Sequence, residues 1–115
     1  GPGTFCVSCA GNGAGSNTVS YLVVAGGGGG ASWGGGGGGA GGYREGKSTS
    51  DSYTANPITA ATGLPVPATP YPITIGGGGA NAPSYPTRGC RSSGSPSIFS
   101  TITSAGGGRG GCIYF

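Results

Sequence analysis

The sequence predicts an all-β fold: a small β-sandwich-like domain or strand bundle with ordered, polyglycine II-like glycine tracts and no helix. Three observations predict it. A short apolar strand runs directly into a block of glycine at residues 21–30, again at 71–79 and again at 98–108. No window shows a 3.6-residue apolar period, and the many Gly and Pro residues would break a helix. Only 6% of the 115 residues are charged, whereas disordered chains are usually highly charged.

The expected elements follow one another along a single small domain. Residues 1–19 form an N-terminal arm in which Phe5 and Val7 alternate with polar or small neighbours, as in a short strand that docks on a neighbouring subunit. Residues 20–115 form a glycine-rich β domain. Its strands are expected at 20–25, 71–75, 97–105 and, very short, 112–115, with the longest glycine tract at 26–42 and Pro-rich or polar loops at 43–70 and 80–96.

Ordered glycine has two architectures open to it. In a polyglycine II rod, with three residues per turn, the N–H and C=O groups point outward and neighbouring rods pair them. In the alternative, flattened glycine strands meet at a crowded interface where only Gly lets two backbones approach. Both make the 31 glycines a packing device and favour an extended, self-associating molecule.

Four cysteines suggest how so thin a core is reinforced. A small domain with one Trp, three Phe and no Met buries little apolar surface and often recruits disulfides or oligomerisation. We expect a disulfide framework of Cys6, Cys9, Cys90 and Cys112, with Cys90–Cys112 and Cys6–Cys9 as the favoured pairs; the other connectivities would tie the arm to the body. With no His and only two acidic residues, no metal or other cofactor is expected.

Catalysis and nucleotide binding are not expected. Nucleophilic catalysis lacks a histidine base, and Glu45 and Asp51 lie in one polar loop. Residues 41–48 fit the formal G-x-x-x-x-G-K-[ST] phosphate-binding pattern, but glycine precedes them and no helix is predicted to follow. The net charge of +3 is scattered and does not predict nucleic-acid binding, and no apolar run approaches the length of a membrane span.

Aromatic side chains are the remaining candidates for contact with a ligand. Trp33, Tyr43, Tyr53 and Tyr85 lie in glycine tracts or loops, where they could stack on sugars or anchor a protein contact. The alternative, which we prefer, is that they cover glycine backbones or fill seams between subunits.

The order of these blocks resembles a known family. Residues 21–28 read Tyr-Leu-Val-Val-Ala-Gly-Gly-Gly, and a Gly-Gly-Tyr-Arg-Glu run follows at 41–45. The strand-to-glycine steps at 73–76 and 97–106 come next in the same order. Together they resemble the glycine-rich domain of phage tail-fibre-like and bacterial surface fibre and adhesin proteins. The resemblance implies an extracellular, virion-surface or cell-surface fibre, adhesin or assembly module, and it carries no catalytic motif.

Three functions are consistent with these features. The first is a structural, non-catalytic subunit of an extracellular filament, whose partners are copies of itself and whose arm adds as a strand to the next protomer. The second is a tail-fibre-type adhesin whose loops bind surface glycans. The third, more distant, is an ice-binding protein built from polyglycine rods, which would need a flat face of small regular residues.

Overall fold

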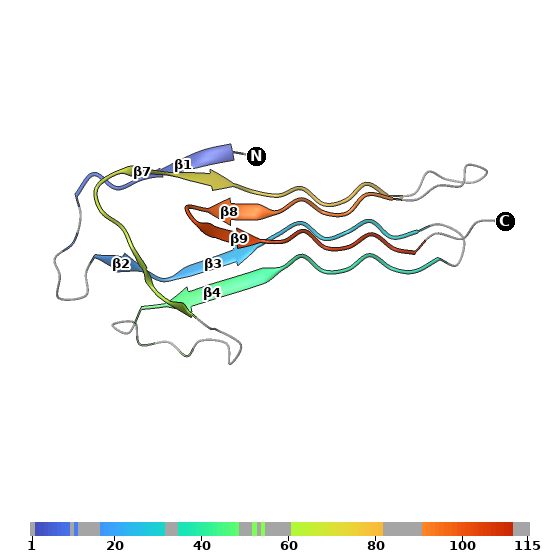
Figure 1. Cartoon of the computed structure of the whole chain (residues 1–115), viewed down its shortest axis with the longest axis horizontal. Coiled ribbons are helices and arrows are strands. Elements are labelled where there is room, and N and C mark those ends of the chain that lie inside the picture. The colour runs from blue at the N-terminus through green and yellow to red at the C-terminus, as the bar shows by residue number, and fades with distance from the viewer. Residues whose placement is uncertain are drawn as a thin grey trace.

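The computed structural model describes residues 2–9, 11, 17–31, 35–48, 52, 54, 61–81 and 91–111. The molecule is elongated, 62 × 29 × 16 Å, with β-strands at one end and extended glycine-rich segments at the other (Figure 1). The described part contains strands and no helix, which confirms the all-β prediction. The strands are β1 (Pro2–Cys6), β2 (Thr18–Val19), β3 (Tyr21–Val24), β4 (Tyr43–Lys47), β5 (Ala61–Thr62), β6 (Leu64–Pro65), β7 (Pro70–Thr74), β8 (Ser97–Phe99) and β9 (Ile102–Ser104).

The strands form two facing sheets and a short extra pair. One sheet has the order β1-β7-β8-β9, the second has β3-β4-β5, and β2 pairs with β6. The arm strand β1 pairs antiparallel with β7 of its own chain, from Pro2 opposite Thr74 to Cys6 opposite Pro70. β3 alternates as a half-buried strand should: Val23 is buried at 8% exposure, while Leu22 and Val24 face outward at 60% and 51%.

Two expectations about the strands are wrong. The single strand expected at 97–105 is a tight hairpin, in which Phe99 pairs with Ile102 and Ile98 with Thr103. The reversal depends on Ser100, whose φ of 54° is in the left-handed region that two-residue hairpin loops require. The start of the loop expected at 43–70 is instead β4, because β3 needs an antiparallel partner for its backbone groups. The fourth strand expected at 112–115 lies outside the described residues.

The core of the β end is small and partly aromatic. Its buried apolar side chains, among the described residues, are Val23, Ala25, Val66 and Tyr71. Phe5 of β1 packs on Tyr71 and Phe99, with ring centroids 6.5 and 6.1 Å away. Phe5 is still 41% exposed, so this contact fastens β1 to the sheet without closing the core.

We expect Phe5→Ala to lower the free energy of unfolding by about 1–2 kcal/mol, because it removes a half-buried ring and two aromatic contacts. The matched control is Thr4→Ala on the same strand, where the side chain is exposed and outside the aromatic group. Urea unfolding monitored by circular dichroism measures both. Equal stability of the two variants would show that Phe5 does not fasten β1.

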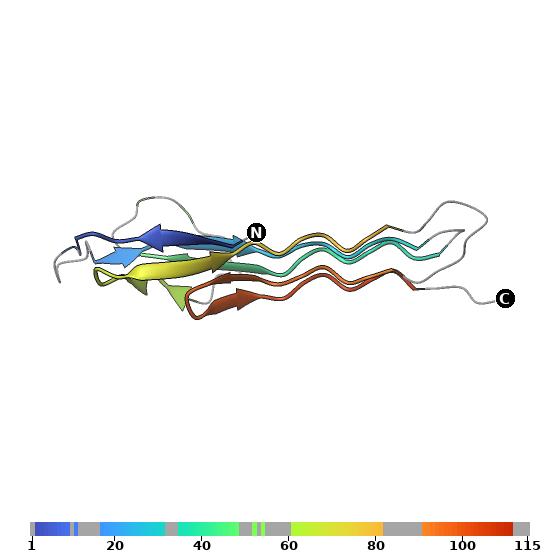
Figure 2. The same ribbon diagram turned by 90° about the horizontal axis from the view of Figure 1, so that it is seen from above.

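Beyond the strands the chain continues in five parallel or antiparallel rods. We number them rod 1 (25–31), rod 2 (35–42), rod 3 (75–81), rod 4 (91–96) and rod 5 (105–111). β3, β7 and β9 run into rods 1, 3 and 5, and rods 2 and 4 run into β4 and β8. Figure 2 shows two layers, rods 3, 1 and 2 in one and rods 4 and 5 in the other. The rods therefore regroup the strands: rod 3 continues β7, which belongs to the sheet of β8 and β9, but it lies in the layer of rods 1 and 2.

Candidate interaction surface

The rods are held together by backbone hydrogen bonds that recur every third residue. The amides of rod 1 alternate between two neighbours in this way. Ala25, Gly28 and Ala31 donate to the carbonyls of Gly42, Gly39 and Gly36 in rod 2, at 3.0, 2.9 and 3.0 Å, and Gly26 and Gly29 donate to Ser95 and Ser92 in rod 4, both at 3.1 Å. Three residues per turn is the period of polyglycine II, whereas a flat strand has period two. The polyglycine II-like prediction is therefore confirmed, over the flattened-strand alternative.

Rod 1 is the centre of the bundle. Its carbonyls at Gly26 and Gly29 accept from Gly107 and Gly110 of rod 5, at 2.8 and 2.9 Å, and its Gly27 carbonyl accepts from Gly79 of rod 3, at 2.8 Å. With the donors to rods 2 and 4, rod 1 is bonded to all four other rods. The arrangement is hexagonal packing of a three-rod layer on a two-rod layer, which gives a stiff slab.

Close approach makes glycine necessary wherever two rods face each other. A Cβ built on Gly28 would collide with the Gly108 carbonyl, and one on Gly26 with the Gly77 carbonyl. The same holds for Gly94, whose Cβ would collide with the Gly26 carbonyl. These collisions are with backbone, which cannot rotate away. Glycine at these positions is a consequence of packing and needs no functional explanation.

A second set of glycines faces outward from the three-rod layer. A Cβ on Gly27 would lie 3.5 Å from its nearest neighbour, one on Gly30 3.8 Å and one on Gly78 3.7 Å, all ordinary contacts, and a Cβ on Gly37 would meet nothing within 4 Å. Residues three positions apart lie on the same side of a polyglycine II rod. Gly27 and Gly30 therefore lie on the same outward side of the layer as Val24, and Gly78 lies on the same side as Ile75. In rod 2, Gly37 and Ala40 lie on the same side as Tyr43.

We call this side the three-rod face and define it by the outward residues of β3, rod 1, rod 2 and rod 3, together with Tyr43, the first residue of β4. Four large apolar side chains lie at its strand end: Leu22 (60% exposed), Val24 (51%), Tyr43 (40%) and Ile75 (59%). The rest is nearly free of side chains. Its members are Leu22, Val24, Gly27, Gly30, Gly37, Ala40, Tyr43, Ile75 and Gly78.

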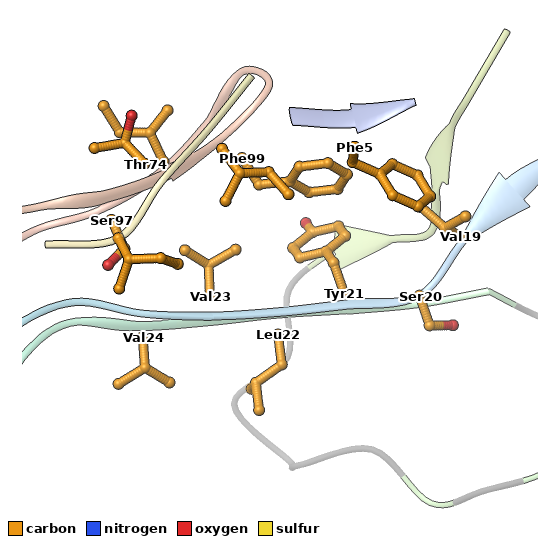
Figure 3. A pocket seen from close by; sticks show the side chains of 13 residues that line it. Phe5, Val19, Ser20, Tyr21, Leu22, Val23, Val24, Thr74, Ser97 and Phe99 are labelled. Atoms are coloured by element: carbon orange, nitrogen blue, oxygen red, sulfur yellow. The ribbon is translucent and has the colours of Figure 1, made fainter. Parts of the chain in front are cut away.

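An open apolar groove lies on the other side of β3. It encloses about 460 Å³ between β3 and the β1-β7-β8 sheet, and its lining includes Phe5, Tyr21, Val23 and Phe99. Figure 3 shows Tyr21 and Val23 pointing into the groove while Leu22 and Val24 point away from it. The polar groups of its lining are side-chain hydroxyls and backbone groups. One of these hydroxyls, that of Ser97, already accepts a hydrogen bond from the Gly76 amide at 2.9 Å. The groove therefore offers apolar contact and no acid–base chemistry.

The structure places only some of the residues singled out from the sequence. Tyr43 is on β4, where its hydroxyl donates to Glu45 Oε2 at 2.6 Å on the outward side of the strand. Cys6 and Cys9 are exposed free thiols, so the Cys6–Cys9 bridge is not formed in this structure; β1 stays extended through Cys6, and the next amide, that of Val7, donates to the Thr69 carbonyl at 3.3 Å. Trp33, Tyr53, Tyr85, Cys90 and Cys112 lie outside the described residues, and the disulfides that involve Cys90 and Cys112 stay predictions.

The formal phosphate-binding pattern has no suitable setting. Gly46 and Lys47 belong to β4, which is paired with β3 and β5, and Gly46 lies directly under the Tyr21 ring. Ser48 itself is not helical, and the Lys47 ammonium donates to the Ser48 carbonyl at 3.4 Å. A cradle for phosphate is absent from this described segment.

The described residues also show what the surface lacks. No group of three or more His, Cys, Asp or Glu side chains among them could hold a metal ion. In the same part of the chain, no helix is long and apolar enough to cross a membrane. The three-rod face and the groove are accordingly the candidate sites, and sequence reasoning missed the face because it appears only when three distant tracts lie side by side.

Comparison with known proteins gives one match. A family model described as a glycine-rich domain matches residues 3–114. No curated protein and no solved structure matches the chain.

Proposed function

Because the chain belongs to the glycine-rich domain family, with which it aligns from residue 3 to residue 114, we propose that it is a non-catalytic structural subunit of an extracellular or surface fibre, assembled by packing of copies of itself. The single observation that carries this proposal is the five-rod slab. The slab forms one end of a molecule 62 Å long, and rod 1 is bonded through its backbone to all four other rods. Such a slab resists bending and offers regular flat surfaces, which are the properties that a fibre subunit needs.

Electron microscopy of the purified chain over a range of concentrations tests the proposal. We expect regular elongated assemblies at high concentration that dissociate on dilution. Light scattering after size-exclusion chromatography gives the mass of the species in parallel. A folded, monodisperse monomer at every concentration would contradict the proposal.

A more specific version of this proposal is that the chain is an adhesin of the phage tail-fibre type. The rods end together at the end of the slab away from the strands. There the Ala31 amide donates to the Gly36 carbonyl, so the two positions that flank residues 32–34 lie together. The Ala80 amide donates to the Ser92 hydroxyl in the same way, so the positions that flank residues 82–90 also lie together. These segments contain Trp33 and Tyr85. Glycan-array binding that is lost in Trp33→Ala and Tyr85→Ala would support this form, and no binding by the wild-type protein would rule it out.

The three-rod face also supports the ice-binding alternative. It supplies the flat array of small residues that this function needs, which the sequence did not clearly predict. Thermal hysteresis of the purified protein tests it directly. An absence of hysteresis at high protein concentration would exclude this alternative.

A further inference from the structure

We propose that the three-rod face is the docking site for the three-rod face of a second copy of this chain, so that two slabs pack as neighbouring glycine layers. The inference rests on the proposed function, since it names the partner and one contact surface of the assembly; the pair formed by this contact is the repeating unit, and growth of the fibre uses a further contact. Three independent observations on the face carry it: glycines that the chain itself does not need, backbone groups that it does not pair, and apolar side chains that it does not bury.

The first observation is glycine without an internal reason. Gly27, Gly30 and Gly78 have room for a methyl group, and none of them has a positive φ. Alanine would reduce the entropy of the unfolded chain at such positions and stabilise the fold. Where two rods face each other, glycine is found because another backbone touches it, whereas Gly77, Gly108 and Gly111 are as open as the glycines of this face. A further backbone packed on the three-rod face would give Gly27, Gly30 and Gly78 the same requirement for glycine.

The second observation is a row of unpaired backbone groups. In the described part of the chain, the amides of Gly27 and Gly30 donate to no partner, whereas the other five amides of rod 1 are all bonded to a neighbouring rod. Their spacing is three residues. A polyglycine II rod lying against this face presents carbonyls at the same three-residue spacing. A second copy of the chain carries such rods. A partner with another backbone geometry would not pair the amides of both Gly27 and Gly30.

The third observation is the apolar margin. Leu22, Val24, Tyr43 and Ile75 lie at the strand end of the face, and they are four of the five exposed large apolar side chains among the described residues. The wide side of the molecule measures 62 × 29 Å, an envelope of about 1,800 Å². Overlap of half of it would bury roughly 900 Å² per copy, against about 800 Å² per partner in standard protein interfaces.

The opposite, two-rod layer has a different surface. Rod 4 carries Ser92, Ser93, Ser95 and Pro96 as exposed residues, and the exposed Arg109 of rod 5 donates to the Arg91 carbonyl at 3.5 Å. Hydroxyl and guanidinium groups are well solvated, and side chains larger than that of glycine prevent the close backbone approach found between the rods. Docking between two three-rod faces is therefore favoured over docking through the two-rod layer, and its two-fold symmetry makes a pair.

Sedimentation velocity over a range of concentrations tests the docking site with three variants. Gly27→Glu and Gly78→Glu place a charged side chain on the face, and each has room for its Cβ within the chain. Gly108→Glu is the matched control, an equally open glycine on the two-rod layer. Melting temperatures establish that each variant is folded.

We expect Gly27→Glu and Gly78→Glu to weaken pair formation at least tenfold and Gly108→Glu to leave it unchanged. If the wild-type chain assembles and the two face variants assemble equally well, the docking site is elsewhere, while the fibre function stands. If Gly108→Glu alone blocks assembly, the two-rod layer is the interface. A wild-type chain that is monomeric throughout would overturn the proposed function and this inference together.

Discussion

Gly28→Ala is expected to lower the free energy of unfolding by about 3 kcal/mol, a large fraction of the roughly 5–15 kcal/mol that is typical of native proteins. The added methyl group would collide with the Gly108 carbonyl in the centre of the slab. Relief would require rods 1 and 5 to separate, which breaks the bonds from Gly107 to Gly26 and from Gly110 to Gly29. Urea unfolding by circular dichroism, or the melting temperature, measures the effect.

Gly27→Ala is the matched control, one residue away on the same rod. Its methyl group meets nothing closer than 3.5 Å, and the backbone there is compatible with alanine. We expect no loss of stability and a gain of up to about 1 kcal/mol from the smaller entropy of the unfolded chain. Similar effects of the two substitutions would mean that rod 1 does not have a packed side and an open side, and would contradict the slab.

Ser97→Ala is expected to destabilise the chain by about 1 kcal/mol, the usual net contribution of one intramolecular hydrogen bond, and by more to the extent that the donor is buried. Ser97 is 1% exposed, and its hydroxyl oxygen accepts the Gly76 amide at 2.9 Å. This bond joins the start of rod 3 to the start of β8, where strand geometry changes to rod geometry. Removing the hydroxyl leaves the half-buried Gly76 amide next to a methyl group.

Ser95→Ala is the control for this site, since Ser95 is exposed and its hydroxyl lies on the surface of rod 4. Its backbone bonds to Gly26 and Gly77 are independent of the side chain. We expect its stability to stay within about 0.5 kcal/mol of the wild-type protein, the usual range for surface substitutions. A loss at Ser95 as large as that at Ser97 would show that serine in rod 4 acts through backbone propensity and not through the Gly76 bond.

The repeated strand-to-glycine step was enough to predict the fold class and the rods. Apolar runs such as the one ending at Ala25 are bounded by glycine, and both signals are local. The hairpin at Ser100 was not predictable, because its turn uses a serine where glycine or asparagine is usual. β4 was missed because its residues are mostly polar, and its strand geometry comes from pairing with β3.

The candidate surface was less accessible to sequence reasoning than the fold. Which glycines are packed and which are open depends on the direction in which each Cβ points. Gly27 and Gly28 are identical in the sequence, yet one faces outward and the other faces the Gly108 carbonyl. The three-rod face also joins residues as far apart as Leu22 and Gly78, whose register is fixed only by bonds between rods, such as that from Gly79 to Gly27.

Amide hydrogen exchange along rod 1, measured by NMR at a dilution that keeps the chain monomeric, tests the slab most directly. The bonding pattern predicts protection with a period of three. Ala25, Gly26, Gly28, Gly29 and Ala31 should exchange slowly, because each amide is bonded to rod 2 or rod 4, and Gly27 and Gly30 should exchange fast. Uniformly fast exchange would mean a disordered tract, and alternation with a period of two would mean a flat strand; either result would contradict the five-rod slab.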